Sequence, residues 1–202
     1  MKNLVNLILI VLLAGCASQN TDKTSDKIAS DKAKKSEVLL VNLSKDILKT
    51  LSARNYKALA VYVHPELGVR FTPYSFVDFK SDRKLTAEQL MNITQPKKKL
   101  LWGEYDGSGE PINMTISEYF SRFVYDADFL GKAQVTVNEV IYSGNTANNV
   151  KEAYPGCEFT EFMIPEIDPQ YEGADWRALR LVFKKENDKI HLVGIIHNEF
   201  TI

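Results

Sequence analysis

The amino-acid sequence predicts an α+β domain in which N-terminal helices pack on a curved antiparallel sheet. Three observations support this fold class. Apolar residues recur at helical spacing early in the chain, two capping boxes mark further helix starts, and alternating β-branched runs fill the second half. Helices that precede antiparallel strands are typical of α+β domains, whereas in a parallel α/β sheet the two element types alternate.

The helices are expected in the first part of the chain. A first helix is predicted over residues 37–53, where five apolar residues recur at the spacing of one helix face: Leu40, Leu43, Ile47, Leu48 and Leu51. Asn55 can cap a short second helix that ends before Pro65, because the residue before a proline disfavours helical geometry. Capping boxes at residues 86–89 and 115–118 predict two more helix starts.

The strands are expected mainly in the later half. Four segments are β-branched or alternate in polarity: 132–142, 159–164, 178–185 and 189–202. Residues 186–188 (Glu-Asn-Asp) form the predicted hairpin turn between the last two, since Asn and Asp tolerate left-handed backbone. The aromatic segment 69–79 is expected to be irregular or a short strand.

The N-terminus has the pattern of a secretory signal. A positively charged start precedes an apolar run over residues 4–14, which is too short to cross a bilayer as a helix. The run ends in Leu13-Ala14-Gly15-Cys16, which resembles the lipobox of bacterial lipoproteins. This resemblance implies a signal peptide over residues 1–15 and a diacylglycerol on Cys16, so that 202 − 15 = 187 residues remain. A plain cleaved signal with an incidental cysteine is the alternative.

The rest of the chain divides into two parts. Residues 17–36 are rich in Ser, Thr, Asp, Lys and Ala, so we expect them to form a flexible tether behind the lipidated cysteine. Residues 37–202 show no Pro/Gly-rich break and are expected to form one domain. The expected location is the cell envelope, anchored to a membrane. Ala17 lies where an aspartate often marks inner-membrane retention in lipoproteins, so the resemblance favours the outer membrane if the cell has one.

Charge and cysteine content exclude several classes of protein. The chain has 25 basic and 26 acidic residues, a formal net charge of −1, so nucleic acid is not an expected partner. Two cysteines do not build a disulfide framework. If Cys16 carries lipid, Cys157 is left unpaired, and we expect it to be inert.

The order of elements over residues 37–202 resembles the cone-shaped fold of nuclear transport factor two and its relatives; a cystatin-like arrangement is the competing fold. Three local strings resemble uncharacterised bacterial lipoproteins: His64-Pro65-Glu66-Leu67-Gly68-Val69-Arg70-Phe71, Trp102-Gly103-Glu104-Tyr105-Asp106-Gly107-Ser108-Gly109 and Leu192-Val193-Gly194-Ile195-Ile196-His197. This lipoprotein family implies no catalytic residues, and relatives by fold include both enzymes and binding domains.

Candidate catalytic residues are few. On an extended strand His191, His197 and Glu199 share one face, so His197 could form part of an acid–base pair. Asp128 and Tyr125 are further candidates, as an acid and a phenol that stabilises oxyanion charge. No nucleophile elbow and no phosphate-binding or dinucleotide-binding motif occurs.

No metal or cofactor is expected. Residues 104–115 resemble a calcium loop around Asp106-Gly107-Ser108-Gly109-Glu110, but Pro111 and Thr115 stand where an aliphatic residue and a bidentate acid are needed, so a Gly-rich turn is favoured. Arginines at positions 70, 177 and 180 stand near aromatic residues. They fit a carboxylate clamp or ion pairs with Asp78 or Asp175, and we favour ion pairs.

The sequence favours a binding domain over an enzyme. An aromatic ligand pocket is predicted from four residues: Phe71, Tyr74, Trp102 and Phe120. The expected function is non-catalytic binding of a small apolar ligand or a protein partner, with His197 exposed and unpaired. The alternative is a small isomerase or dehydratase-type enzyme that uses a pocket acid or base. A homodimer through the sheet is a further possible assembly.

Overall fold

The computed structural model describes residues 21–93, 96–142, 144 and 146–201. The chain forms two compact units, Met1–Ser36 and Glu37–Ile202. Cys16 and the expected signal peptide lie outside the described residues.

Helix α1 spans Thr21–Ser52, so it begins well before the predicted residue 37. The expectation of a segment without regular structure therefore does not hold from Thr21 onward. Acidic and basic residues four positions apart, such as Asp31 and Lys35, stabilise the exposed first part of this helix, which has no buried face. Its side chains between residues 30 and 39 are exposed, and burial begins at Leu40.

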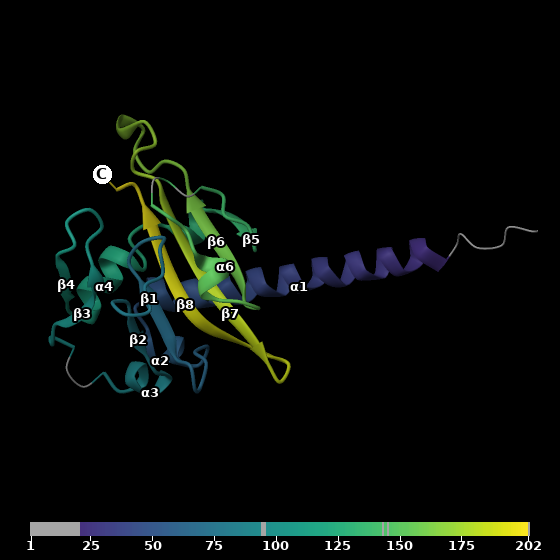
Figure 1. Ribbon diagram of the computed structural model, residues 1–202, viewed down its shortest axis with the longest axis horizontal. Coiled ribbons are helices and arrows are strands. Elements are labelled where there is room, and N and C mark those ends of the chain that lie inside the picture. The colour runs from purple at the N-terminus through teal and green to yellow at the C-terminus, as the bar shows by residue number, and fades with distance from the viewer. Residues whose placement is uncertain (1–20, 94–95, 143, 145, 202) are drawn as a thin grey trace, which may run out of the picture. The chain divides into compact units, whose positions relative to one another are not determined.

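The main sheet has six strands in the order β2-β1-β8-β7-β6-β5 (Figure 1). These strands are β1 (Val69–Thr72), β2 (Arg83–Leu85), β5 (Gln134–Val137), β6 (Glu158–Ile164), β7 (Arg177–Glu186) and β8 (Lys189–Glu199). All neighbours are antiparallel except β1 and β8, which run parallel. The sheet is thus mixed, and the prediction of a purely antiparallel sheet is wrong at this pair.

Strands β3 (Leu100–Glu104) and β4 (Pro111–Met114) form a separate hairpin. The Gly-rich residues 105–110 connect them, and the backbone N–H of Tyr105 donates to the carbonyl of Glu110 at 2.8 Å. The segment that resembles a calcium loop is therefore a hairpin turn here.

Local signals account for several element ends. The β7–β8 turn is confirmed at Asn187 and Asp188, whose φ angles of 48° and 60° are those of a two-residue hairpin. The predicted strand 132–142 shortens to β5, because Asn138 adopts a φ of 57° and its side chain accepts a hydrogen bond from the backbone N–H of Phe159.

The short helices begin at the predicted caps. Asn55 caps α2 (Tyr56–Ala60), and capping boxes start α3 (Ala87–Met91) and α4 (Ile116–Phe123). The remaining helical segments are α5 (Phe129–Lys132), α6 (Val150–Ala153) and a 3₁₀ turn at Pro169–Tyr171. The α+β class is confirmed, but five strands precede α6, so the two element types are less segregated than expected.

The sheet buries side chains on both faces. The larger cluster includes Phe71 and Leu181 of the sheet with Leu48 of α1 and Phe120 of α4. A smaller cluster on the other face joins four sheet residues to Val77 and Val150: Phe159, Val182, Val193 and Ile196. In Figure 1, α6 lies against this second face. Because both faces of the central strands are covered, a homodimer through the sheet would have to use an edge strand.

Candidate functional site

A β-bulge in β8 separates two of the candidate residues. The register between β7 and β8 shifts where Val193 adds one residue to β8. An extra residue reverses the alternation of side chains between the two faces. The prediction that His191, His197 and Glu199 share a face is therefore wrong for His191, while His197 and Glu199 remain together.

His197 is fully buried, contrary to the expectation of an exposed ring. Its Nδ1 lies 3.1 Å from the carbonyl oxygen of Pro73, and its Nε2 lies 3.1 Å from Oδ2 of Asp126. A carbonyl and an ionised carboxylate only accept hydrogen bonds, so both ring nitrogens face acceptors within the protein. Because the ring is also fully buried, neither nitrogen is open to a substrate with which it could exchange a proton.

Charged residues extend the contact into a closed network. Arg177 Nε donates to Asp126 Oδ2 at 2.8 Å, and Arg177 Nη2 lies 3.3 Å from Oε2 of Glu199. Arg122 donates to both carboxylate oxygens of Glu199. Burial by itself raises the pKa of Asp126, but the charges of His197 and Arg177 outweigh burial and hold that pKa below its usual range.

The same network bears on metal binding. Three residues each offer one possible metal-ligand atom: Asp126, His197 and Glu199. These atoms all lie within 4.8 Å of one another, a spacing that could hold a metal ion. However, the guanidinium groups of Arg122 and Arg177 already neutralise these carboxylates. The residues fit a structural ion-pair network better than a metal centre.

The other two catalytic candidates have local structural contacts. Asp128 is exposed and accepts a hydrogen bond from the backbone N–H of Gly131 at 3.0 Å, at the start of α5. The hydroxyl of Tyr125 accepts from the N–H of Leu130 at 3.3 Å, and burial raises its pKa. The acid that reaches His197 is Asp126, which nothing in the sequence distinguished from Asp128.

The predicted aromatic pocket residues pack mainly in the core. Phe71, Trp102 and Phe120 are almost wholly buried and contact one another or Tyr119, whose ring stacks on Trp102 with centroids 4.1 Å apart. This packing gives no support to a ligand pocket at these three residues. Tyr74 lines a cavity, described below.

The three arginines have different environments. Arg177 belongs to the network above, and Arg180 forms a fully buried ion pair with Glu161. The preference for ion pairs is therefore confirmed for these two, with partners other than Asp78 and Asp175. Arg70 instead donates to the carbonyl oxygens of Asp82, at 2.8 Å, and Phe79.

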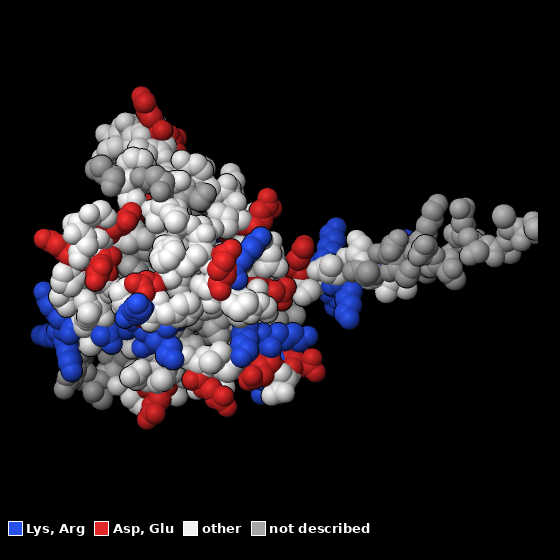
Figure 2. All heavy atoms as spheres, viewed as in Figure 1, with Lys and Arg blue, Asp and Glu red and all other residues white. Residues whose placement is uncertain are grey.

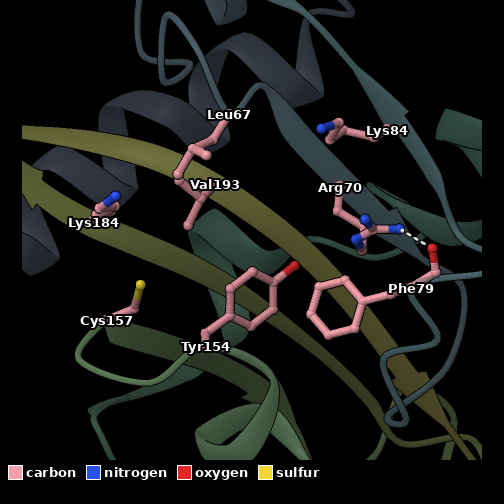
Figure 3. Close-up of a pocket in the computed structure, with 8 residues that line it drawn as sticks. All are labelled: Leu67, Arg70, Phe79, Lys84, Tyr154, Cys157, Lys184 and Val193. Atoms are coloured by element: carbon pink, nitrogen blue, oxygen red, sulfur yellow. Dashed lines mark hydrogen bonds between the residues drawn. The ribbon is translucent and has the colours of Figure 1, made fainter.

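A cavity of about 200 Å³ lies beside Arg70, on the face of the sheet that carries α6 (Figure 3). Eight residues line it: Leu67, Arg70, Phe79, Lys84, Tyr154, Cys157, Lys184 and Val193. Three of these are cations and none carries a carboxylate. Figure 2 shows Lys and Arg side chains in a band across this face of the domain. The cavity thus combines apolar walls with positive charge.

Tyr154 stands in the middle of this cavity in Figure 3. Its hydroxyl is buried beside the Arg70 guanidinium, which can only donate to it, and its own proton has no acceptor among the described residues. Burial raises the pKa of Tyr154 far above its usual value, so the phenol stays protonated and can donate. A buried donor without an acceptor is costly, and such groups in native proteins often meet a ligand or ordered water.

Cys157 lines the same cavity as a free, half-buried thiol. Burial raises its pKa and the charge of Lys184 opposes this only in part. A thiol with a raised pKa has little thiolate at neutral pH, as expected for an unreactive cysteine.

A second cavity, of about 300 Å³, adjoins the β3–β4 turn and includes Tyr74. Its charged residues are all acidic: Asp78, Asp82, Glu104 and Asp106. Burial raises the pKa of Asp82 to about 7, although Thr72 donates a hydrogen bond to it. Several polar groups there bind one another, such as Ser81 and Asp78. A third cavity, of about 220 Å³, also has basic and apolar walls and includes Arg83 and Lys98. The buried hydroxyl of Tyr154, rather than charge alone, therefore makes the cavity beside Arg70 the candidate site.

Comparisons with known proteins returned no match among family models, curated proteins or solved structures. Among the described residues, no helix has the length and apolar character required to cross a membrane.

Proposed function

We propose that this protein is a lipid-anchored binding domain of the cell envelope, which holds a small ligand with an apolar body. The observation that carries the proposal is the cavity of about 200 Å³ walled by Leu67, Phe79 and Val193. Ligand sites are concave and mainly apolar, with a few polar groups that fix orientation. The hydroxyl of Tyr154, whose proton has no acceptor among the described residues, is such a group.

The anchor is the part of the proposal that concerns localisation. Its support is the string Leu13-Ala14-Gly15-Cys16 behind an apolar run. In this proposal the lipid on Cys16 holds the domain at a membrane, the outer one if the cell has two. A nuclear transport factor two-like cone, or a cystatin-like arrangement, is the finer fold that we retain as a proposal for residues 37–202.

An isomerase or dehydratase-type enzyme is the second candidate, favoured by the contact between His197 and Asp126. The same geometry weakens it, because the ring is fully buried and both nitrogens are bonded. A general base needs a free lone pair near the substrate. The binding function is therefore the stronger proposal.

Replacement of Cys16 tests the anchor. Cys16→Ser removes the sulfur that would carry the lipid, so we expect release from the membrane fraction or accumulation of the unprocessed chain. Membrane fractionation and mass spectrometry of the intact protein measure both. Normal processing with unchanged membrane association would refute the anchor.

Filling the cavity tests ligand binding. Val193→Phe places a ring into the cavity, so binding of octanoate and of 1-octanol to the whole chain should fall at least tenfold in calorimetric titrations. Val135→Phe adds the same ring at an exposed position of β5, so it is the matched control and should leave the binding of both octanoate and 1-octanol unchanged. Cys157→Phe fills the cavity from another side, in case Val193→Phe disturbs folding. Failure of both probes to bind the unaltered chain would reject the proposal.

A further inference from the structure

We infer that the ligand of this cavity is an amphiphilic anion: one apolar tail that ends in a carboxylate or a phosphate. The inference rests on the proposed function and specifies its ligand class. It follows from the arrangement of the lining residues, whose charges are all positive and whose remaining surface is mostly apolar.

The cations enclose the cavity from two sides. In Figure 3, Arg70 and Lys84 lie on one side and Lys184 on the other. Arg70 and Lys84 are in register on β1 and β2, so the sheet fixes their spacing. Lys184 has an acid nearby, but its Nζ lies 3.9 Å from Glu186 and both side chains are about 40% exposed, at 39% and 41%. Such a pair is weak, so the charge of Lys184 is available to an anion.

Arg70 is held in place for this role. Its Nη1 donates to the carbonyl oxygen of Asp82 at 2.8 Å, and its guanidinium lies over the ring of Phe79, 4.6 Å from the centroid. The nearby carboxyl of Asp82 has a pKa of about 7, so near neutral pH it offsets only part of the positive charge. A guanidinium fixed by backbone carbonyls is preorganised for an anionic head group.

Tyr154 supplies the neutral donor. Its hydroxyl, whose proton has no acceptor among the described residues, points toward the side of the cavity that holds Arg70 (Figure 3). An anionic oxygen between Arg70 and this hydroxyl would accept hydrogen bonds from both, and a charged acceptor makes such bonds stronger. The tail would then pack on Phe79 and Val193.

The cavity volume limits the tail. About 200 Å³ corresponds to about seven water-sized volumes, so the cavity takes a short alkyl chain or a single ring. Longer chains would extend into solvent. Octanoate and octyl phosphate are therefore suitable probes, with 1-octanol as the uncharged analogue.

Calorimetric titration of the whole chain at pH 7.5 tests the inference. Octanoate or octyl phosphate should bind at least tenfold more tightly than 1-octanol, and the difference should shrink at high salt. Lys84→Met and Lys184→Met should each weaken binding of the anions about threefold to tenfold and leave 1-octanol unchanged. Lys132→Met, at an exposed position of α5, is the control and should change neither the binding of the anions nor that of 1-octanol.

The outcomes separate the inference from the proposed function. Equal binding of anion and alcohol, or anion binding that neither lysine variant changes, overturns the inference and leaves an apolar site intact. Binding of neither probe rejects both. Nonanoate, whose alkyl tail matches the eight carbons of octyl phosphate, serves as a further probe, so that a preference for one anion identifies the head group.

Discussion

Gly194 is the residue on which the shape of the basic cavity depends most directly. A Cβ at this position would lie 2.8 Å from the hydroxyl oxygen of Tyr154 and 3.2 Å from Cβ of Val182. The absence of a side chain therefore allows the phenol to lie against β8. This contact places the one neutral donor of the site.

Gly194→Ala should accordingly displace the ring of Tyr154. We expect a loss of about 1–3 kcal/mol in the free energy of unfolding, the usual cost of overpacking, and weaker octanoate binding. Denaturant unfolding measures the change in the free energy of unfolding, and calorimetric titration measures octanoate binding. In a Tyr154→Phe background the hydroxyl is absent, so the same substitution should cost less. An equal cost in both backgrounds would show that the contact with the hydroxyl does not matter.

Asp82 makes stability depend on pH in an unusual direction. Its folded pKa of about 7 lies above its ordinary value of 3.8. The folded state therefore binds the proton more tightly, and this group's contribution is fully present below pH 3.8 and is lost as pH rises to about 7. The lowered pKa values of Asp78 and Asp126 act in the opposite direction.

Asp82→Asn isolates this contribution. The difference in unfolding free energy between the natural chain and the variant should change by about 3–4 kcal/mol between pH 4 and pH 8, with the natural chain relatively more stable at the acidic end. Urea unfolding at a series of pH values provides the measurement. A difference that stays constant with pH would contradict the raised pKa.

At the scale of elements, strands β6 and β7 are joined by a buried ion pair. Glu161 and Arg180 are opposite each other in the register, and both side chains are fully buried. Arg180 also donates to Ser75 Oγ at 3.0 Å, and Glu161 accepts from the N–H of Ile141. The pair thus connects the sheet to two loops on its α6 side.

Removal of one member of this pair should be much worse than removal of both. Glu161→Leu leaves a buried guanidinium without its counter-charge, and we expect a loss of about 3–5 kcal/mol. The double variant Glu161→Leu/Arg180→Met should recover a large part of that loss, although the loop contacts stay broken. Thermal or denaturant unfolding of the natural chain, the single variant and the double variant gives the stabilities to be compared. Equal stability of single and double variants would argue against a coupled pair.

The elements that the sequence predicted well are those with local signals. Caps at Asn55, Thr86 and Thr115 and the turn at 187–188 depend only on neighbouring residues, and all are confirmed. The parallel pairing of β1 with β8 joins residues more than a hundred positions apart, so no local pattern predicts it. Hydrophobic periodicity does not predict the first part of α1, because a helix exposed on all sides has no apolar stripe.

The candidate site was harder to predict than the fold. The bulge at Val193 changes the face of every later residue of β8, and a strand pattern does not reveal one extra residue. The cavity residues come from β1, β2, β7, β8 and three loops, so only the tertiary fold brings them together. Arg70 stands near aromatic residues in the sequence, but no sequence pattern distinguishes Lys84, Lys184 or Tyr154.

At the scale of the whole molecule, a proposed lipid anchor is joined to a domain that has a basic, apolar cavity beside Arg70. A net charge of −1 hides this local excess of positive charge, because the acidic residues lie elsewhere, including the cavity beside Asp106. Local charge rather than net charge therefore determines what the domain attracts at short range.

The most direct test of the central claim is an intermolecular NMR experiment on the isotope-labelled whole chain with unlabelled octanoate. We expect nuclear Overhauser effects from the octanoate methylene protons to the methyl groups of Val193 and the rings of Tyr154 and Phe79. Lys184→Met should weaken these effects, whereas Lys132→Met should not. Contacts confined to other surfaces, or none at saturating octanoate, would contradict the claim that this cavity is the binding site.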